Sequence, residues 1–383
     1  MNNSKNVLVV TALSGFVRAF LLDDIRILQS MGYKVYCAAN GENDDRKLEE
    51  NINEFRKMGV IFMQVPFSSN KPLSKTNWHA YRKIKKILKE IQFSAIHIHT
   101  PIPGVIVRMA AQKYRKKCKV IYTTHGFYFH KGCGIKKWVV YYVIEKIMSI
   151  FSDAIITINK EDYNNAKRMF CKRVFHINGV GVETERYNIL VDRSEMRKKL
   201  NLSETDIAIL SVGELSERKN HQVIINAMEI EGNSNLIYLI CGKAIEGEGT
   251  YGYLKQLAKE KKVRVVFLGY RKDIPEISKA VDIGAIPSTR EGLGLAGIEM
   301  LAAGLPLLAA KVHGIVDYAV DGKTGYLANP YSPEEFADNI KKLENKEVRN
   351  RMKKNCYEMS KKFDMSVSHK QRQEIYYNIL GKE

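Results

Sequence analysis

The chain has 383 residues, too many for one ordinary hydrophobic core, so we expect two domains of somewhat under about 200 residues each. Hydrophobic residues make up 45% and charged residues 27% of the sequence, as in folded globular proteins. The formal net charge of +19 suits a polyanionic partner such as nucleic acid, an anionic membrane or a phosphorylated substrate, although a lysine-rich proteome would give the same charge.

Cysteine usage and hydropathy argue against several classes of protein. Six cysteines are spread along the chain without a close pair, which indicates reduced thiols in the cytosol rather than a disulfide framework or a zinc site. The first residues contain no long apolar segment, and no window reaches about eighteen consecutive apolar residues. We therefore expect no signal peptide and no membrane-spanning helix.

Short β-branched runs alternate with helical patterns along the whole chain. A first series of expected strands covers residues 6–11, 34–39, 60–66, 95–100, 119–125 and 154–159. A second series covers residues 173–178, 207–215, 236–242, 263–269, 282–288 and 305–310. Apolar runs separated by helices indicate parallel sheets covered on both faces, and two series indicate two Rossmann-like domains with ligands bound in the cleft between them. The polar, turn-rich segment 178–188 marks the junction.

A nicotinamide dehydrogenase does not fit the first domain. The first strand leads into residues 11–20, TALSGFVRAF, which lack the G-x-G-x-x-G turn. The second strand ends at Ala39-Asn40 without an acid for a ribose, and such an enzyme normally needs both features.

The segment 290–299, REGLGLAGIE, follows the expected strand 282–288. Glu291 lies in the strand-to-helix turn, where Gly292 and Gly294 allow a ligand to approach the backbone closely. A helix beginning near Gly294 would present free N–H groups to a phosphate, with Glu299 roughly one to two turns further on. Carboxylates accept hydrogen bonds from sugar hydroxyls, so the segment suits a nucleotide-sugar. The alternative is that Glu291 caps the helix and Glu299 is a solvated helix residue.

Five further segments accompany this one in a fixed order. Together they resemble the retaining GT-B glycosyltransferases of family 4, and the N-terminal pair is similar to the bacterial branch that makes capsule, exopolysaccharide or O-antigen. The segments are 98–101 (IHTP), 124–127 (THGF), 178–183 (NGVGVE), 211–221 (SVGELSERKNH), 267–270 (FLGY) and 291–299 (EGLGLAGIE).

The resemblance implies a role for each matching residue. Glu291 is expected to bind the donor-sugar hydroxyls and Glu299 the nucleotide ribose. Lys219, with Arg218, is expected to stabilise the departing diphosphate. This chain departs from the family pattern at Glu214, where an arginine is common, so Arg218 either substitutes for it or points away. The implied catalytic residues are Glu291, Lys219, Arg218 and His125, and the implied donor-binding residues are Gly15, Gly213, Arg218, Lys219, Tyr270, Glu291, Gly292, Leu293, Gly294, Leu295 and Glu299.

Two N-terminal positions carry plainer alternatives. Gly15 could let the first helix approach the diphosphate, or could be an ordinary turn glycine. His125 resembles the histidine that touches the donor sugar, although a histidine at a strand end is usually structural, and His99 has the same ambiguity.

The sequence contains no D-x-D motif and no His/Cys/Asp cluster with metal-ligand spacing, so we expect neither a metal nor another cofactor. No pair of carboxylates is posed as nucleophile and acid. For a retaining family this favours attack on the same face of the sugar, with the leaving phosphate taking the acceptor's proton.

Three segments of the first half suit an anionic membrane or a lipid-linked acceptor. Residues 76–90 form a basic amphipathic helix with an aromatic, which could lie on a bilayer or pack on the core with a solvated lysine face. Residues 113–119 are basic, and residues 136–151 could line an acceptor groove or form a buried helix. The candidate membrane or acceptor residues are Trp78, Arg82, Lys85, Lys86, Lys136, Lys137 and Trp138.

These observations lead to an α/β, GT-B chain with an acceptor-side domain at 1–180, a nucleotide-sugar domain at 181–364 and a C-terminal helix at 365–383 that crosses back to the first domain. We expect a hexose or N-acetylhexosamine to move from a UDP-sugar to a polyprenyl-diphosphate-linked saccharide, in the cytoplasm and peripherally on the inner membrane face, without nucleic acid. The rivals are a UDP-sugar 2-epimerase on the same fold and a basic, non-catalytic membrane or nucleic-acid binding module.

Overall fold

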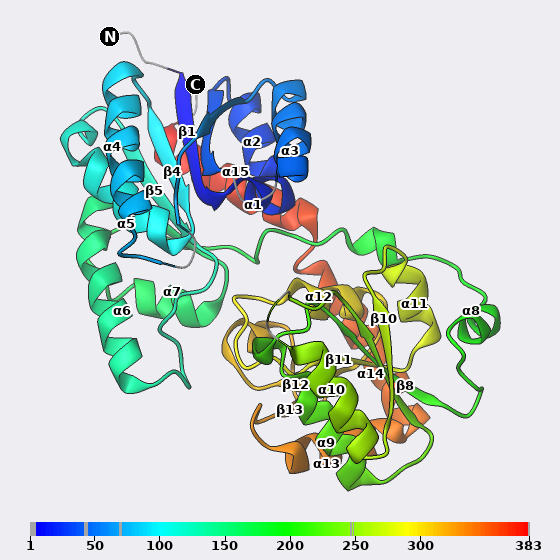
Figure 1. Ribbon diagram of the computed structural model, residues 1–383. Helices are drawn as coiled ribbons and strands as arrows, with labels where there is room; N and C mark the ends of the chain where they lie inside the picture. The colour runs from blue at the N-terminus through cyan, green and yellow to red at the C-terminus, as the bar shows by residue number, and fades with distance from the viewer. Residues whose placement is uncertain (1–4, 42–44, 69–70, 246, 248, 382–383) are drawn as a thin grey trace. The chain divides into compact units, whose positions relative to one another are not determined.

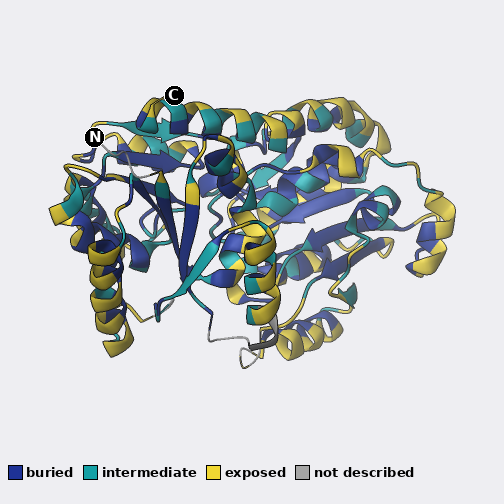
Figure 2. Ribbon diagram, turned by 90° about the horizontal axis from the view of Figure 1, so that it is seen from above, coloured by how far each residue is buried: buried dark blue, intermediate teal, exposed yellow. Residues whose placement is uncertain are grey.

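The computed structural model describes residues 5–41, 45–68, 71–245, 247 and 249–381. The chain divides into two compact units, one of residues 1–180 with 366–383 and one of residues 181–365. Each unit is a parallel sheet covered by helices (Figure 1). In both, the sheets are buried while the outward sides of the helices are exposed (Figure 2).

The N-terminal unit contains a seven-stranded sheet in the order β3-β2-β1-β4-β5-β6-β7, with every pair parallel. Its strands are β1 (Asn6–Leu13), β2 (Lys34–Asn40), β3 (Ile61–Gln64), β4 (Ala95–His99), β5 (Lys119–Thr124), β6 (Ala154–Thr157) and β7 (Val174–His176). The strand order reverses between β1 and β4, and in such sheets ligands bind outside the carboxyl ends of strands at this point.

Helices cover both faces of this sheet, as parallel crossover connections require. The helices α1 (Ser14–Phe20), α2 (Leu22–Ser30) and α3 (Asp45–Lys57) lie on one face, and α4 (Lys75–Glu90), α5 (Pro101–Ala111) and α6 (Ile135–Met148) lie on the other (Figure 1). The short elements η1 (Gln112–Tyr114), η2 (Ser149–Phe151) and α7 (Lys160–Ala166) complete the unit.

The C-terminal unit repeats this plan with six parallel strands in the order β10-β9-β8-β11-β12-β13. The strands are β8 (Ile207–Val212), β9 (Leu236–Cys241), β10 (Arg264–Gly269), β11 (Ile283–Ile286), β12 (Leu307–Ala310) and β13 (Gly325–Ala328). The helical elements are η3 (Thr184–Tyr187), α8 (Arg193–Lys199), η4 (Glu217–Lys219), α9 (His221–Glu231), α10 (Thr250–Glu260), α11 (Ile274–Ala280), α12 (Leu295–Ala302), η5 (His313–Asp317), α13 (Pro333–Glu344) and α14 (Lys346–Lys361). Here the order reverses between β8 and β11.

The last helix, α15 (Met365–Leu380), packs on the N-terminal unit through a buried charged network. The Arg372 guanidinium lies 2.6 Å from Asp24 and 2.7 Å from Asp23, and the Tyr376 hydroxyl donates to Asp24 at 2.6 Å. Burial would raise the pKa of the Asp24 carboxyl, but the charge of Arg372 outweighs it and lowers the pKa. The carboxylate therefore stays ionised and holds the helix in place.

One expectation about the strands was wrong, and one strand was missed. The run 173–178 was placed in the second series, but β7 pairs with β6 and closes the first sheet. The chain turns only after it, at Gly179 and Gly181, whose φ values are +73° and +90°. The strand β13 was not expected, since a four-residue segment that begins with glycine carries little strand signal.

Candidate active site

The candidate site of the C-terminal unit lies where its strand order reverses. The segment after β8 contains Glu214, Arg218 and Lys219, and the segment after β11 contains Glu291. Because β8 and β11 are neighbouring parallel strands, both segments leave the same edge of the sheet. Residues 72 positions apart in sequence therefore meet, as Arg218 and Arg290 do at 3.1 Å.

Glu291 is buried at the centre of this meeting. Its Oε1 accepts hydrogen bonds from Lys219 Nζ at 2.8 Å, Arg218 Nη1 at 2.8 Å and Ser288 Oγ at 2.9 Å. In the described part of the chain no donor contacts its other oxygen, Oε2. Burial alone would raise the pKa of Glu291, but the charges of Lys219 and Arg218 lower it. The site thus holds an ionised carboxylate whose Oε1 accepts three hydrogen bonds and whose Oε2 has no donor among the described residues.

Arg218 bridges two acids. Its Nη1 contacts Glu291 and its Nη2 donates to Glu214 Oε1 at 2.8 Å. The residue that departs from the family pattern, Glu214, is therefore paired with the cation expected to replace the usual arginine. Two cations and two carboxylates balance each other in this cluster, and a diphosphate would have to share the cations with the carboxylates.

Glycine at position 213 lets Lys219 reach Glu291. A Cβ added at Gly213 would lie 2.9 Å from Lys219 Cε, which is closer than real Cβ atoms approach. Asn220 then fastens this loop to the other one, because its side-chain amide donates to Pro287 O at 3.1 Å and to Pro330 O at 2.7 Å. Asn220 has a φ of +54°, a conformation that asparagine tolerates better than most residues.

The glycine turn after Glu291 is held from beneath by one tyrosine. The helix α12 begins at Leu295, with Gly294 as its N-cap at a φ of +81°. The Tyr318 hydroxyl donates to Gly294 O at 3.0 Å, and a Cβ on Gly297 would lie 2.3 Å from that hydroxyl. The turn and the first N–H groups of α12 therefore have a fixed position. The Gly297 N–H donates to Gly294 O at 3.0 Å, whereas the N–H groups of Leu295 and Ala296 have no carbonyl within the helix to bind.

Glu299 lies one turn into α12 and faces another tyrosine. The buried hydroxyl of Tyr187, on η3, donates to its carboxylate. Burial raises the pKa of Glu299, although the Tyr187 hydrogen bond opposes the shift. Glu299 is therefore half-buried beside Tyr187 rather than a solvated helix residue.

The structure brings only some of the expected donor residues together. Gly213, Arg218, Lys219 and Glu291 form one cluster, and Gly292, Leu293, Gly294 and Leu295 continue from it into α12. Tyr270 lies outside the cluster, at the end of β10, where it is exposed beneath the Lys243 ammonium at 5.4 Å. Its role stays a prediction.

In the N-terminal unit, the expected residues follow the carboxyl ends of β1 and β5. Gly15 is exposed in the first turn of α1, and a Cβ there would meet no atom within 4 Å. The half-buried His125 follows β5, with its ring edge against Phe16 at 4.9 Å and its Nε2 3.0 Å from His99 Nδ1. Burial lowers the pKa of His125 to about 4, so the ring is neutral at pH 7. Its contact with a sugar stays a prediction.

Of the expected membrane residues, the structure exposes all but one. Trp78, Arg82, Lys85 and Lys86 are exposed on α4, while Ile84, Ile87 and Leu88 of the same helix pack into the core. Lys136 and Lys137 are exposed at the start of α6. Trp138 instead turns inward, stacked on Tyr142 at 4.7 Å and edge-on to Phe129 at 5.9 Å. No helix among the described residues is long and apolar enough to cross a membrane.

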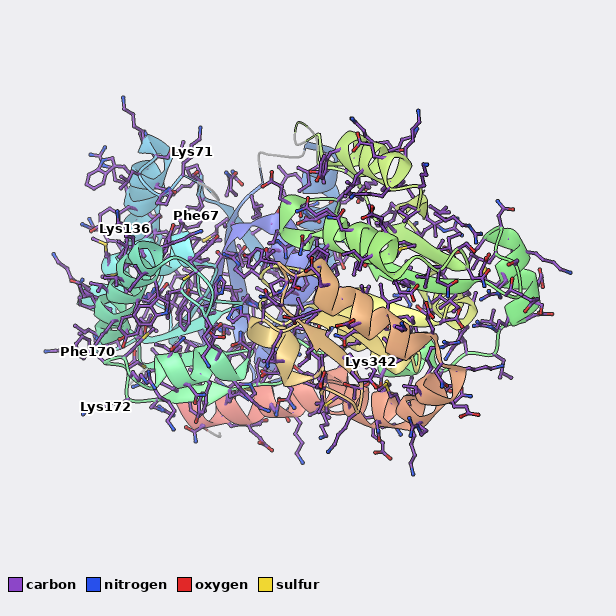
Figure 3. All side chains as sticks on the ribbon, turned by 90° about the horizontal axis from the view of Figure 1, so that it is seen from below. Phe67, Lys71, Lys136, Phe170, Lys172 and Lys342 are labelled. Atoms are coloured by element: carbon purple, nitrogen blue, oxygen red, sulfur yellow. The ribbon has the colours of Figure 1, made fainter. Side chains whose placement is uncertain are left out.

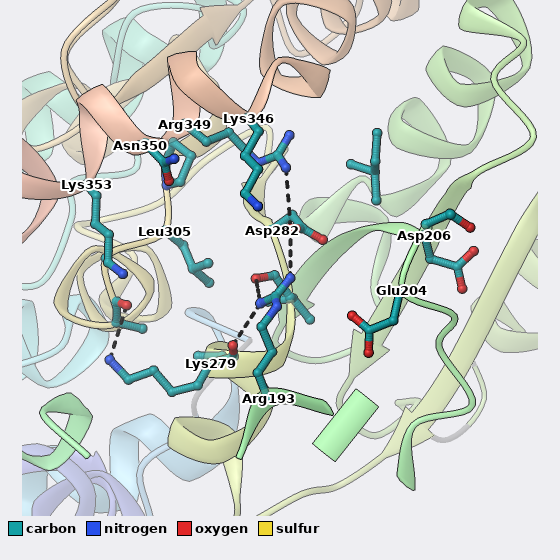
Figure 4. A pocket seen from close by; sticks show the side chains of 17 residues that line it. Arg193, Glu204, Asp206, Lys279, Asp282, Leu305, Lys346, Arg349, Asn350 and Lys353 are labelled. Atoms are coloured by element: carbon teal, nitrogen blue, oxygen red, sulfur yellow. Dashed lines mark hydrogen bonds and ion pairs between the residues drawn. The ribbon is translucent and has the colours of Figure 1, made fainter. Parts of the chain in front are cut away.

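One pocket lies next to the candidate site, and another lies at the opposite edge of the sheet. One of about 670 Å³ adjoins Arg218 and is lined by residues of α9 and α10 with Thr289 and Tyr331. Another, of about 440 Å³, lies at the amino ends of β8 and β11, at the opposite edge of the sheet (Figure 4). There Arg193 contacts Asp282 at 2.9 Å and Arg349 contacts it at 3.5 Å, so these charges already compensate one another.

The sequence did not single out Ser288, Asn220 or Tyr187 as site residues. Ser288 and Tyr187 belong to the site through their hydrogen bonds to Glu291 and Glu299, which form only in the folded chain. Neither residue has a distinctive sequence signal. Asn220 does: an asparagine directly before a helix, in the segment 211–221, is typical of a position with special backbone geometry. No group of three or more histidine, cysteine and acidic side chains posed for a metal ion occurs in the ranges that the structure describes.

Family models, curated proteins and a solved structure relate this chain to known proteins. Residues 19–186 match the family model "Glycosyltransferase Family 4" and residues 192–359 match "Glycosyl transferases group 1". The chain is 32% identical to the putative glycosyltransferase EpsD of Bacillus subtilis, covering 90% of this chain and 88% of that protein. It is 26% identical to UDP-Gal:alpha-D-GlcNAc-diphosphoundecaprenol alpha-1,3-galactosyltransferase of Escherichia coli over 71% of each chain. Anabaena Alr3699/HepE, solved with UDP and glucose, superposes with a TM-score of 0.76 at 18% identity over 97% of this chain and 99% of that one.

Proposed function

Because this chain belongs to glycosyltransferase family 4 and has the GT-B fold, we propose that it moves a hexose or an N-acetylhexosamine from a UDP-sugar to a lipid-linked saccharide. The product would be part of a capsule, an exopolysaccharide or an O-antigen. Two relatives support the choice of substrates: by their names, one uses UDP-Gal and a diphosphoundecaprenol-linked sugar, and another binds UDP with glucose.

The arrangement of Glu291 carries the proposal. Three donors fix its Oε1, and the hydrogen bond from a sugar hydroxyl is assigned to Oε2, which has no donor among the described residues. The low pKa keeps the carboxylate ionised, and an ionised acceptor binds a hydroxyl more strongly than a neutral one does. The glycine turn and the start of α12 next to it offer N–H groups to the diphosphate.

The reaction we propose retains the configuration at the anomeric carbon and needs no metal. The bond from that carbon to the diphosphate oxygen breaks, and the acceptor hydroxyl oxygen bonds the carbon on the same face. The hydroxyl proton passes to the departing phosphate oxygen. Lys219 and Arg218, with the N–H groups of α12, would stabilise the charge that develops on the diphosphate.

The same proposal places the protein in the cytoplasm, held peripherally on the inner face of the membrane. A lipid-linked acceptor resides there, and the net charge of +19 favours an anionic surface.

The test is turnover of a panel of UDP- and GDP-sugars on a polyprenyl-diphosphate-linked saccharide, with and without a chelator. The wild type should transfer one UDP-sugar in both conditions, and Glu291→Ala should lose the activity. Glu195→Ala, which removes an exposed acid paired with Lys199 on α8, is the matched control and should keep it. No turnover with any donor by a folded protein would sink the proposal, and conversion of the UDP-sugar to its 2-epimer would favour the epimerase.

A further inference from the structure

The helix α6 buries its acidic residue and exposes apolar residues, the reverse of an ordinary surface helix. Glu145, its one acidic residue, points inward, where its Oε2 lies 2.7 Å from Arg108 Nη2 and its Oε1 accepts from the Tyr122 hydroxyl at 3.3 Å. Arg108 is 0% exposed and also lies over the Tyr122 ring at 4.3 Å. The inward side of the helix thus contributes to a buried ion pair packed against an aromatic ring.

The outward side of the same helix is apolar. Side chains at least 40% exposed follow one another three and four positions apart, as on one face of a helix. They are Ile135, Val139, Val140, Val143, Ile144 and Ile147, continued by Ile150 in η2 and by Phe170. Phe170 lies beside this α6 face, because its backbone N–H donates to Ser149 Oγ at 2.9 Å and the Lys146 ammonium lies 5.2 Å from its ring. Single exposed aliphatic residues are ordinary, but a contiguous set marks a surface that binds something.

Cations surround the α6 face. Lys136 and Lys137 are exposed at its first turn, and the Lys146 ammonium lies 5.2 Å from the Phe170 ring. Lys136, Phe170 and Lys172 lie along the same margin of the N-terminal unit in Figure 3. At the far end, Arg115 donates to Ile150 O at 2.8 Å, which places the basic segment 113–117 beside the face. The acids next to this face, Glu145 and Asp153, are both paired with arginines.

From this combination we propose that the α6 face inserts into the interfacial region of an anionic lipid bilayer. Apolar side chains ringed by lysines match acyl chains below a layer of anionic headgroups. A second copy of the chain fits less well, because a two-fold contact would bring the same lysines against each other. The proposal rests on the proposed function for its purpose, since it would bring the enzyme to a lipid-linked acceptor. Of the two helices that carry the expected membrane residues, it selects α6, because the apolar side of α4 packs into the core.

Co-sedimentation of the purified protein with vesicles of phosphatidylcholine, with and without phosphatidylglycerol, tests it without any nucleotide-sugar. Wild type should bind the anionic vesicles, and Val143→Ser with Ile147→Ser should weaken binding at least tenfold. Leu190→Ser with Ile230→Ser removes two exposed aliphatic residues of the other unit and should leave binding unchanged. Lys136→Gln with Lys137→Gln should weaken binding about thirtyfold, since each lysine near the surface contributes about 1 kcal/mol. The same pair of changes at Lys85 and Lys86 on α4 should cost less than twofold.

Equal unfolding midpoints show that the variants are folded, as expected for exposed positions. Wild type that does not sediment, or a Val143/Ile147 variant that binds as the wild type does, would overturn the inference. So would a dimer in solution that this variant converts to monomer. Donor hydrolysis or transfer to a soluble saccharide by the same preparations separates the two claims: turnover without vesicle binding removes only this inference, and vesicle binding without turnover removes only the proposed function.

Discussion

The ammonium of Lys219 lies 2.8 Å from Oε1 of Glu291, in a space that exists because residue 213 is glycine. Lys219→Met should therefore lower kcat/KM for the nucleotide-sugar by about 100-fold or more, the cost of losing one charge-stabilising group from an active site. Lys261→Met, which breaks the exposed pair with Glu229 at 3.0 Å, is the matched control and should change kcat/KM less than twofold. Equal losses in the two variants would mean that Lys219 has no special role.

Replacing Glu299 by glutamine should raise the stability of the protein relative to the wild type but lower its affinity for UDP. Its pKa is raised by burial, so the folded state holds a proton that the unfolded state releases above about pH 4.3. Stability of the wild type is thus lost as the pH rises through the folded pKa, whereas Glu299→Gln avoids this loss and still accepts from Tyr187. In urea unfolding, the free energy of unfolding of the variant should increase relative to that of the wild type as the pH rises from 4 to 7.

The same variant should bind UDP about tenfold more weakly, because a carboxylate accepts ribose hydroxyls more strongly than an amide does. Isothermal titration with UDP measures this. An unchanged affinity would remove Glu299 from the nucleotide site while leaving the pH result intact.

Gly15 offers a test of the N-terminal half of the expected donor site. No atom lies within 4 Å of a Cβ placed there, so Gly15→Ala should fold normally and gain up to about 1 kcal/mol from helix propensity. If a diphosphate approaches this backbone, the same methyl group should raise KM for the donor about tenfold or more. Gly252→Ala, also in a helix with open space around it, should be as stable and keep the wild-type KM. Identical KM values for the two variants would make Gly15 a plain turn glycine.

The network that holds α15 predicts a large loss of stability. Arg372→Met leaves the buried Asp24 carboxylate without its cation and the half-buried Asp23 with His369 alone, and should cost about 3–5 kcal/mol of unfolding free energy. Lys354→Met breaks an exposed pair with Glu358 at 3.9 Å and should cost less than about 0.5 kcal/mol. Urea unfolding of the two variants decides the matter, and a cost below about 1 kcal/mol for Arg372→Met would show that the pair does not hold the helix.

Much of the fold could be predicted because its signals are local. Buried parallel strands read as β-branched runs, and the turn of Glu291 reads as glycines between a strand and a helix, so β11, Gly294 and α12 were placed correctly. Strand β7 was assigned to the wrong sheet because a short run next to a junction does not say which neighbour it pairs with.

What the sequence could not supply depends on contacts between distant segments. From the sequence alone, Glu145 in an apolar run would be expected to face water. Its buried partner, Arg108, is 37 positions away and cannot be recognised from the sequence. The outward apolar face of α6 follows only once that pair is known. In the same way, Glu214 stands where the family pattern often has an arginine. Only the position of Arg218 in the structure shows that Glu214 is paired with a cation.

The central claim concerns Glu291, and Glu291→Gln tests it most directly by comparing transfer with UDP binding. The amide keeps the shape of the side chain but leaves Lys219 without its carboxylate and Arg218 with Glu214 alone, so UDP should bind as tightly as before or more tightly. Transfer of the sugar should fall about 100-fold or more, because the acceptor of the sugar hydroxyl has lost its charge. A variant that transfers sugar at the wild-type rate, or that loses UDP binding and transfer in equal measure, would contradict the account.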